Sequence, residues 1–145
     1  MGHDWEGNEG RANFTARFSN NMDRLRFQDG RLLEAHVRHI TVSGIVDTGA
    51  AMCVISQAMA DKLGLPFNSE VTVKYADSRT AKRNIVEQLE VEIMGRRSTF
   101  RAVVEPDRNA PLIGVIVLED LDLLVDPRNQ TLHPRDPAIQ TFKLE

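Results

Sequence analysis

The sequence is short of several features that mark particular classes of protein. A single cysteine, Cys53, excludes an intrachain disulfide framework and a cysteine-rich zinc site, and it fits a reducing compartment. No apolar run is long enough to cross a bilayer, and residues 1–6 have neither the basic start nor the apolar core of a signal peptide. We therefore expect a protein without a membrane segment, located in the cytoplasm, or a soluble fragment of a larger protein.

The chain also has no excess of positive charge. The formal net charge is -3, and no cluster of Lys and Arg is long enough to follow a phosphate backbone, so nucleic acid is a poor partner. With 145 residues, 41% of them hydrophobic, the chain is long enough for one core and too short for two. Residues 1–13 are polar, carry three glycines and have little apolar surface, which predicts a flexible N-terminal arm. Residues 14–145 are expected to form a single domain.

Short alternations of apolar and polar residues, separated by turn residues, predict a mostly β fold. The predicted strands and hairpins are 33–42, 71–75 with 85–86, and 89–93 with 100–104. Helical signals are few. The two predicted helices are 56–63, which begins at the N-cap residue Ser56 and stops at Gly64, and 118–123.

The segment with the clearest chemical content is Gly44–Ser56. Asp47 comes directly after β-branched residues, so its carboxylate is expected at a strand end, in a tight turn. Thr48 supplies a hydroxyl, and Gly49 permits the close approach of a neighbouring chain or substrate. A strand that ends in an Asp-Thr-Gly turn is common, so the tripeptide alone is only moderately specific.

A second element raises the specificity of the first. Leu112, Ile113 and Gly114 form an apolar pair followed by glycine, and a short helix rich in leucine is expected after them. This order repeats the order of the first element. The two halves are consistent with an old duplication in which only the first half keeps its aspartate.

Together the two motifs resemble those of the retropepsin-like aspartic proteases, and more closely their small prokaryotic members. The resemblance runs from about Ala35 to His133. It implies a retropepsin-like acid protease β-barrel with one or two short helices, and a homodimer that acts on polypeptides without cofactor or metal. Asp47 is then the catalytic residue. The residues implied to support it in the active site are Thr48, Gly49 and Ala50.

The chemistry independently favours a dimer. Hydrolysis of a peptide bond by aspartates needs two carboxyls that share one proton, and the chain has one Asp-Thr-Gly. A partner related by two-fold symmetry must therefore supply the second Asp47. Of the terminal segments, Ile139–Phe142 is expected to complete the dimer sheet. The residues implied to form a flap over substrate are Tyr75, Ala76, Asp77, Ser78 and Arg79.

A dimeric binding or regulatory module with the same fold and no measurable proteolysis is the alternative. The fold alone does not distinguish the two. Asp47, Thr48 and Gly49 favour the enzyme, whereas Ala51 and a flap tip without glycine favour the module. An unrelated β-barrel with an accidental Asp-Thr-Gly turn ranks below both.

Other residues with chemical potential have simpler interpretations. His36 and His39 are expected on opposite faces of one strand, where they cannot chelate the same metal ion. Cys53 lies in an apolar run and is expected to be a buried, inert thiol. Arg96 and Arg97 are expected to keep a hairpin turn soluble.

Overall fold

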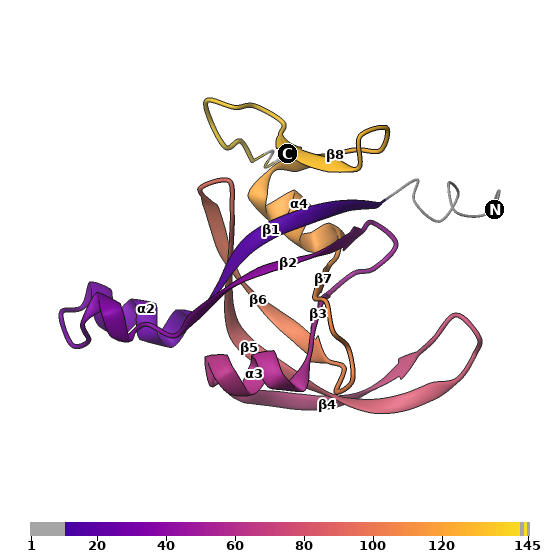
Figure 1. Cartoon of the computed structure of the whole chain (residues 1–145), viewed down its shortest axis with the longest axis horizontal. Coiled ribbons are helices and arrows are strands. Elements are labelled where there is room, and N and C mark those ends of the chain that lie inside the picture. Colours follow the sequence, from indigo (N-terminus) through magenta and orange to yellow (C-terminus); the bar gives the residue numbers. More distant parts are fainter. Residues whose placement is uncertain (1–10, 143, 145) are drawn as a thin grey trace.

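The computed structural model describes residues 11–142 and 144. This part of the chain is mostly β, as predicted, and Figure 1 shows how its elements are arranged. The elements in chain order are β1 (Arg11–Asn20), α2 (Asn21–Gln28), the 3-10 helix η1 (Glu34–His36), β2 (His39–Asp47), β3 (Cys53–Ile55), α3 (Gln57–Leu63), β4 (Phe67–Lys74), β5 (Thr80–Ile93), β6 (Arg96–Val104), β7 (Leu112–Ile113), α4 (Val115–Leu121), β8 (Leu123–Asp126) and β9 (Thr131–Pro134).

Strands β1 to β7 form one sheet that closes on itself. The strand order is β1-β2-β7-β3-β6-β5-β4, and β1 also pairs with β5, so every strand of this sheet except β4 belongs to a closed ring. Strands β8 and β9 form a separate antiparallel hairpin that contacts β1, and β8 also contacts α4. Because the ring has no free edge, β4 is left as the edge strand of the sheet.

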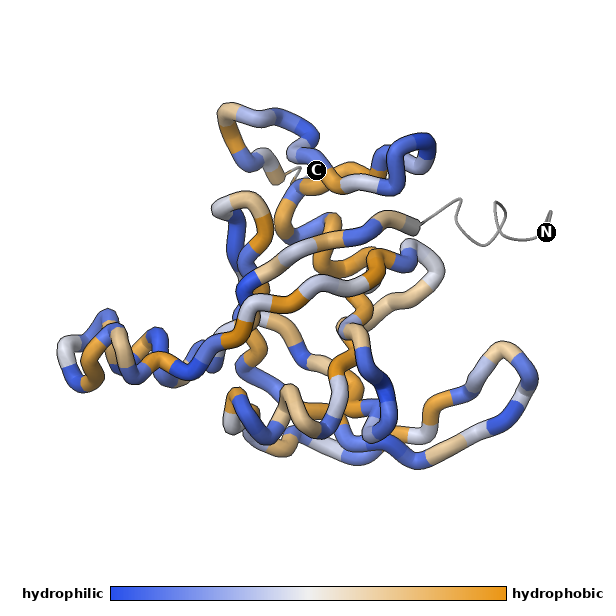
Figure 2. Tube along the Cα trace, in the orientation of Figure 1, coloured by the Kyte–Doolittle hydropathy of each residue, from blue (hydrophilic) through white to orange (hydrophobic). Residues whose placement is uncertain are grey.

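Alternating burial along β1 supplies one wall of the core. Apolar and polar residues alternate along this strand, whereas α4 begins with a continuous apolar run (Figure 2). Phe14 and Phe18 of β1 are buried and stack with their ring centroids 6.4 Å apart. Val117 and Leu121 of α4 belong to the same hydrophobic cluster. Burial of each large side chain contributes roughly 1.5–3 kcal/mol, which fixes α4 against the ring.

Helix α2 was not predicted, and the described residues contain three α-helices where one or two were expected. Asn20 caps it, since its Oδ1 accepts a hydrogen bond from the Asp23 amide at 3.0 Å. The buried residue of the helix is Asp23, a carboxylate. An apolar stripe with a 3.6-residue period is the signal that reveals a helix in a sequence, and α2 lacks one.

The strand predicted over 33–42 is wrong in its first half. Residues 34–36 form η1, and the strand runs instead from His39 to Asp47. The backbone N–H of Arg38 donates to the Asp23 carboxylate at 3.0 Å, and its carbonyl accepts from Asn20 at 2.9 Å. This segment is therefore bound to the start of α2 before it reaches the sheet, and His36 lies outside any strand.

Both predicted hairpins are confirmed. Strands β4 and β5 pair up to Lys74 and Thr80, and β5 and β6 pair up to Ile93 and Arg96. The two predicted helices are also present, as α3 and α4, although α4 begins and ends earlier than predicted: it follows Gly114 directly, and Leu123, which was predicted within it, begins β8. Within the described residues no helix is long and apolar enough to cross a membrane.

The N-terminal segment differs from expectation where the structure describes it. Residues 11–13 belong to β1, while residues 1–10 of the predicted arm lie outside the described part of the chain. Residues 139–142 form no strand within this single chain, so their predicted place in the sheet of a dimer stays a prediction. In the single chain, Gln140 Nε2 donates to the Asp120 carbonyl at 2.7 Å, and the Thr141 amide donates to Asp122 at 3.0 Å.

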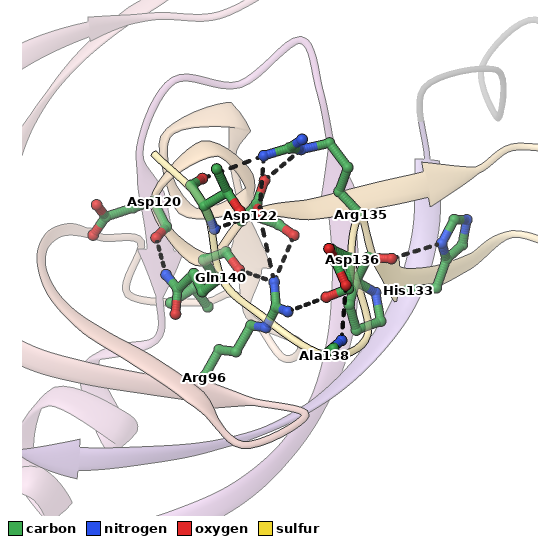
Figure 3. A network of polar contacts seen from close by, with 11 residues as sticks. Arg96, Asp120, Asp122, His133, Arg135, Asp136, Ala138 and Gln140 are labelled. Atoms are coloured by element: carbon green, nitrogen blue, oxygen red, sulfur yellow. Dashed lines mark hydrogen bonds and ion pairs between the residues drawn. The ribbon is translucent and has the colours of Figure 1, made fainter. Parts of the chain in front are cut away.

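Asp122 is the centre of a polar network that fastens this C-terminal segment to α4 (Figure 3). Arg135 donates to both oxygens of its carboxylate, at 2.7 and 3.1 Å. The Thr141 amide and the Arg135 guanidinium hold the pKa of Asp122 below its usual range. Arg96, whose side chain is only 10% exposed, donates to the carbonyls of Leu121 and Asp122. The expectation that Arg96 is a solvated turn residue is therefore wrong.

Candidate active site

Asp47 is the last residue of β2, and its side chain organises the turn that follows. Its Oδ1 accepts a hydrogen bond from the Gly49 amide at 2.9 Å, and its carbonyl accepts from the Ala50 amide at 3.0 Å. Such a bond from a carboxylate to the backbone two residues on stabilises a tight turn. Thr48 and Gly49 are exposed, whereas Asp47 and Ala50 are half-buried. The predicted Asp-Thr-Gly turn is present, and its tip is open to solvent in this chain.

Strand β7 brings the second motif against the first. Ile45 and Val46 of β2 pair in parallel with Leu112 and Ile113, and Leu112 also pairs with β3. The Ile45 amide donates to the carbonyl of Pro111 at 3.1 Å. The Asp47 turn connects β2 to β3, and β7 lies between these two strands. The two motifs that the sequence suggested are therefore direct neighbours.

Gly114 is required by a close approach of two backbones. The Val115 amide donates to the carbonyl of Ala50 at 2.9 Å. A Cβ added at Gly114 would lie 2.3 Å from the carbonyl oxygen of Ala50 and 2.8 Å from the carbonyl carbon of Ala51. Any side chain at this position would displace the turn that carries Asp47.

The residues predicted as a flap form the turn of the β4–β5 hairpin, which projects from the body of the molecule (Figure 1). The Tyr75 amide donates to the Arg79 carbonyl at 2.8 Å, and Asp77 accepts from Arg79 Nε at 2.6 Å. This pairing with Arg79 lowers the pKa of Asp77. Ser78 has a φ of 71°, so the turn adopts a left-handed conformation without a glycine.

A cavity of about 500 Å³ lies between this hairpin and the segment that follows β6. Glu105 is central to it, because its Oε1 accepts from Arg83 Nε and its Oε2 accepts from the Tyr75 hydroxyl at 2.6 Å. Burial raises the pKa of Glu105, but the hydrogen bonds from Tyr75 and Arg83 outweigh it and leave the pKa below its usual range. The lining residues are Tyr75, Arg79, Thr80, Ala81, Arg83, Glu105, Pro106, Asp107 and Arg108.

The sequence did not point to Glu105 or Arg83. Arg83 lies on β5 and Glu105 directly follows β6, and neither belongs to a motif, so only the fold brings them together. Tyr75 was predicted at the flap, but its bond to Glu105 was not.

Residues 33–120 of the chain match the family model described as gag-polyprotein putative aspartyl protease. This match covers more than half of the chain and contains both the Asp47 turn and Gly114. The chain belongs to this aspartyl protease family. The predicted retropepsin-like family is thereby confirmed, and the mostly β ring is consistent with it. No curated protein gives a significant match.

A second and larger cavity of the aspartyl protease domain lies elsewhere. It measures about 1050 Å³ and lies between β6, α4 and the C-terminal segment, where Ile116 and Phe142 contribute apolar surface. Neither Asp47 nor the residues of the hairpin turn line it. Size alone would therefore select a different site from the one that the two motifs select.

Metal binding and a cysteine nucleophile are two other kinds of chemistry to compare with the Asp47 turn. In residues 11–142 and 144, no group of three or more His, Cys, Asp or Glu side chains is placed to hold a metal ion. Cys53 is buried, as predicted, and burial raises the pKa of its thiol to about 12. A thiol with so high a pKa is a poor nucleophile near neutral pH.

Proposed function

We propose that this chain is an aspartic endopeptidase that works as a homodimer, with Asp47 of each subunit at the catalytic centre. The observation that carries the proposal is the Asp47–Ala50 turn itself. It stands at the end of a central strand, is held from one side by β7 and Gly114, and belongs to a chain of the aspartyl protease family.

The exposure of the turn supports a dimer. Each chain has one Asp-Thr-Gly, and Thr48 and Gly49 at its tip are exposed in the single chain. A two-fold axis that passes beside this tip would bring the same residues of two copies together, because a two-fold interface uses the same surface of both subunits. Thr48 would then bond to the backbone of the partner across the axis.

Two carboxyls that share one proton are sufficient for the reaction. The ionised Asp47 takes a proton from a water molecule, whose oxygen adds to the peptide carbonyl carbon. The protonated Asp47 of the other subunit gives its proton to the carbonyl oxygen, which becomes a hydroxyl group in the tetrahedral intermediate. The C–N bond then breaks, and a proton returns through the carboxyls to the leaving nitrogen. The Gly49 amide orients one carboxylate oxygen throughout.

The β4–β5 hairpin is assigned the role of a flap. Residues 75–79 at its turn would cover the bound polypeptide and exclude water from the reacting bond. Leu112, Ile113 and Gly114 have a supporting role, since they hold the strand and turn that carry Asp47.

The alternative is a dimeric binding or regulatory module, and one observation favours it. The hairpin turn has no glycine and is closed internally by the pair Asp77–Arg79, so it has less conformational freedom than a glycine-rich flap. A module that only binds a polypeptide does not need a flap that opens and closes in each turnover.

Cleavage of unfolded casein at about pH 4–5 tests the proposal, because a shared proton requires acidic conditions. The wild-type chain should cleave casein, and Asp47→Asn should lose all cleavage. Asp61→Asn, in which an exposed aspartate of α3 is changed in the same way, should keep it. If the wild type forms dimers but cuts nothing between about pH 3 and pH 7, the binding module is the better assignment.

A further inference from the structure

The outer part of the β4–β5 hairpin has no third strand beside it. The pairing of β5 with β6 stops at Ile85 and Val103, whereas its pairing with β4 continues to Thr80 and Lys74. Residues 70–84 therefore form a two-stranded arm, and within the described chain no other strand pairs with it. A two-stranded hairpin by itself is only marginally stable in water, so the position of the arm needs another contact.

Glu105 provides that contact from a fixed point. Its backbone N–H donates to the carbonyl of Ile55 at 2.9 Å, which holds it at the end of β3. Its side chain crosses to the arm, where one oxygen accepts from Arg83 on β5 and the other from the Tyr75 hydroxyl beside the turn. One carboxylate thus binds two separate points of the arm.

The other polar contacts of the arm stay within it. Arg79 pairs with Asp77, and its guanidinium lies over the Tyr75 ring at 5.2 Å from the centroid. Both partners of the Asp77–Arg79 pair are more than half exposed, whereas the side chains of Glu105 and Arg83 are 21% and 28% exposed. Hydrogen bonds to an ionised group are stronger than neutral ones, and partial burial reduces their screening by salt.

We propose that Glu105 is a positioning residue that holds the hairpin arm against the 105–110 segment before substrate arrives. The same segment leads directly into β7, which pairs with the end of β2 just before the Asp47 turn. The arm and the candidate catalytic turn are therefore positioned from one stretch of chain. The effect on cleavage rests on the proposed function, but the position of the arm does not.

Hydrogen exchange of the whole chain tests the position of the arm without any substrate. In Glu105→Gln, which keeps the shape of the side chain but loses its charge, amide exchange over residues 71–83 should be roughly three- to tenfold faster. Glu87→Gln is the matched control, because Glu87 lies on the same hairpin and bonds to Asn68. In Glu87→Gln, amide exchange over the arm should be as slow as in wild type.

Tyr75→Phe tests the hydrogen bond to Glu105 separately from a general loss of structure, since it removes only one hydroxyl. It should also accelerate exchange of the arm, and it should add less in the Glu105→Gln background than in wild type, because the two groups share one hydrogen bond that Glu105→Gln already weakens. Additive effects of the two changes, or unchanged exchange in Glu105→Gln, would overturn the proposal.

Cleavage kinetics then show whether the arm serves catalysis. With a peptide substrate, Glu105→Gln should raise KM several-fold and change kcat less than about twofold, because substrate must then order the arm as it binds. Faster exchange with unaltered KM would leave Glu105 as a structural residue and overturn the positioning role. If wild type shows no cleavage, the proposed function fails, while exchange still decides whether Glu105 holds the arm.

Discussion

At Gly114 the backbone leading out of β7 approaches the Asp47 turn so closely that a methyl group has no room. The nearest atoms belong to the backbone of Ala50 and Ala51, which cannot move aside as the end of a flexible side chain could. Asp47 is therefore positioned both by its own bond to Gly49 and by a residue that lies more than sixty positions further along the chain.

Gly114→Ala should lower the free energy of unfolding by about 1–3 kcal/mol, as overpacking commonly does. It should also reduce cleavage by more than the loss of folded protein explains, because the added methyl group pushes on the turn that carries Asp47. Urea unfolding and casein cleavage measure the two effects. Ile116→Ala, at a half-exposed position of α4, should change both much less. Equal stability and activity in Gly114→Ala would contradict the close approach.

Asp23 is a second residue whose environment decides its role. Its buried carboxylate accepts from the Arg38 backbone and from the Arg38 guanidinium at 2.8 and 3.1 Å. The hydrogen bond from the Arg38 side chain is the main reason that the pKa of Asp23 lies below its ordinary value of 3.8. A carboxyl with a lowered folded pKa stabilises the fold above its unfolded pKa and loses that contribution as pH falls.

Asp23→Asn should therefore lower the free energy of unfolding by about 2 kcal/mol near neutral pH, since it weakens hydrogen bonds to a buried charge. The difference in the free energy of unfolding between the two proteins should shrink as pH falls from 3.8 through the lowered pKa of Asp23, where the folded wild-type carboxyl also becomes protonated. Thermal unfolding of both proteins across this pH range measures it. Asp29→Asn alters a pair with Arg31 in which both side chains are largely exposed, and it should have little effect. If the difference in stability between wild type and Asp23→Asn did not change with pH, the charge of Asp23 would not be what stabilises the fold.

At the scale of elements, the C-terminal segment is attached to α4 by side chains rather than by strand pairing. Asp122 ends the helix in a left-handed conformation and binds Arg135 and Thr141, while Arg96 of β6 binds the last carbonyls of the helix. Cations near a helix C-terminus are favourable, which adds to these bonds. Residues 135–142 are thereby kept beside α4, as Figure 3 shows.

Asp122→Asn should release this segment. Asparagine tolerates the left-handed conformation, so the change removes the charge with little backbone strain. We expect faster amide exchange at Thr141 and earlier proteolytic cutting within residues 135–142, while the exchange of the ring strands stays the same. Asp126→Asn in the β8–β9 hairpin is the control, because Asp126 caps its own turn and does not contact this segment. Unchanged exchange at Thr141 would show that other contacts hold the segment.

At the scale of the whole molecule, the proposed activity depends on a second copy of the chain. The ring of strands and its core are complete within one chain, but each chain has a single Asp-Thr-Gly. Stability of the fold and completeness of the active centre are therefore different requirements. Under the proposed mechanism, a variant that folds normally is still inactive when one of the two Asp47 carboxyls is missing.

Mixing wild type with Asp47→Asn subunits measures this dependence. At concentrations well above the dimer dissociation constant, an equal amount of mutant added to a fixed amount of wild type should reduce cleavage to about one half, because random pairing places half of the wild-type subunits in mixed dimers. A monomeric enzyme would keep its full activity. Sedimentation equilibrium of each protein alone verifies that dimers are present.

Local patterns in the sequence predicted much of the fold. The two hairpins, α3 and the Asp47 turn each depend on neighbouring residues, through alternation, caps and turn formers. Helix α2 escaped prediction because it buries Asp23 instead of an apolar stripe, and the strand at 33–42 was predicted too early because Arg38 bonds to that same carboxylate. Both errors arise from one long-range contact.

The sequence by itself determined the family, the mostly β class and the place of Asp47 in an Asp-Thr-Gly turn, because these depend on residue identity and short-range order. Only the tertiary structure decided that Gly114 lies against this turn, that Glu105 binds the hairpin arm and that Arg96 caps α4. Each of these contacts joins residues far apart in the chain. Their pairing follows from the closure of the sheet, which no local pattern encodes.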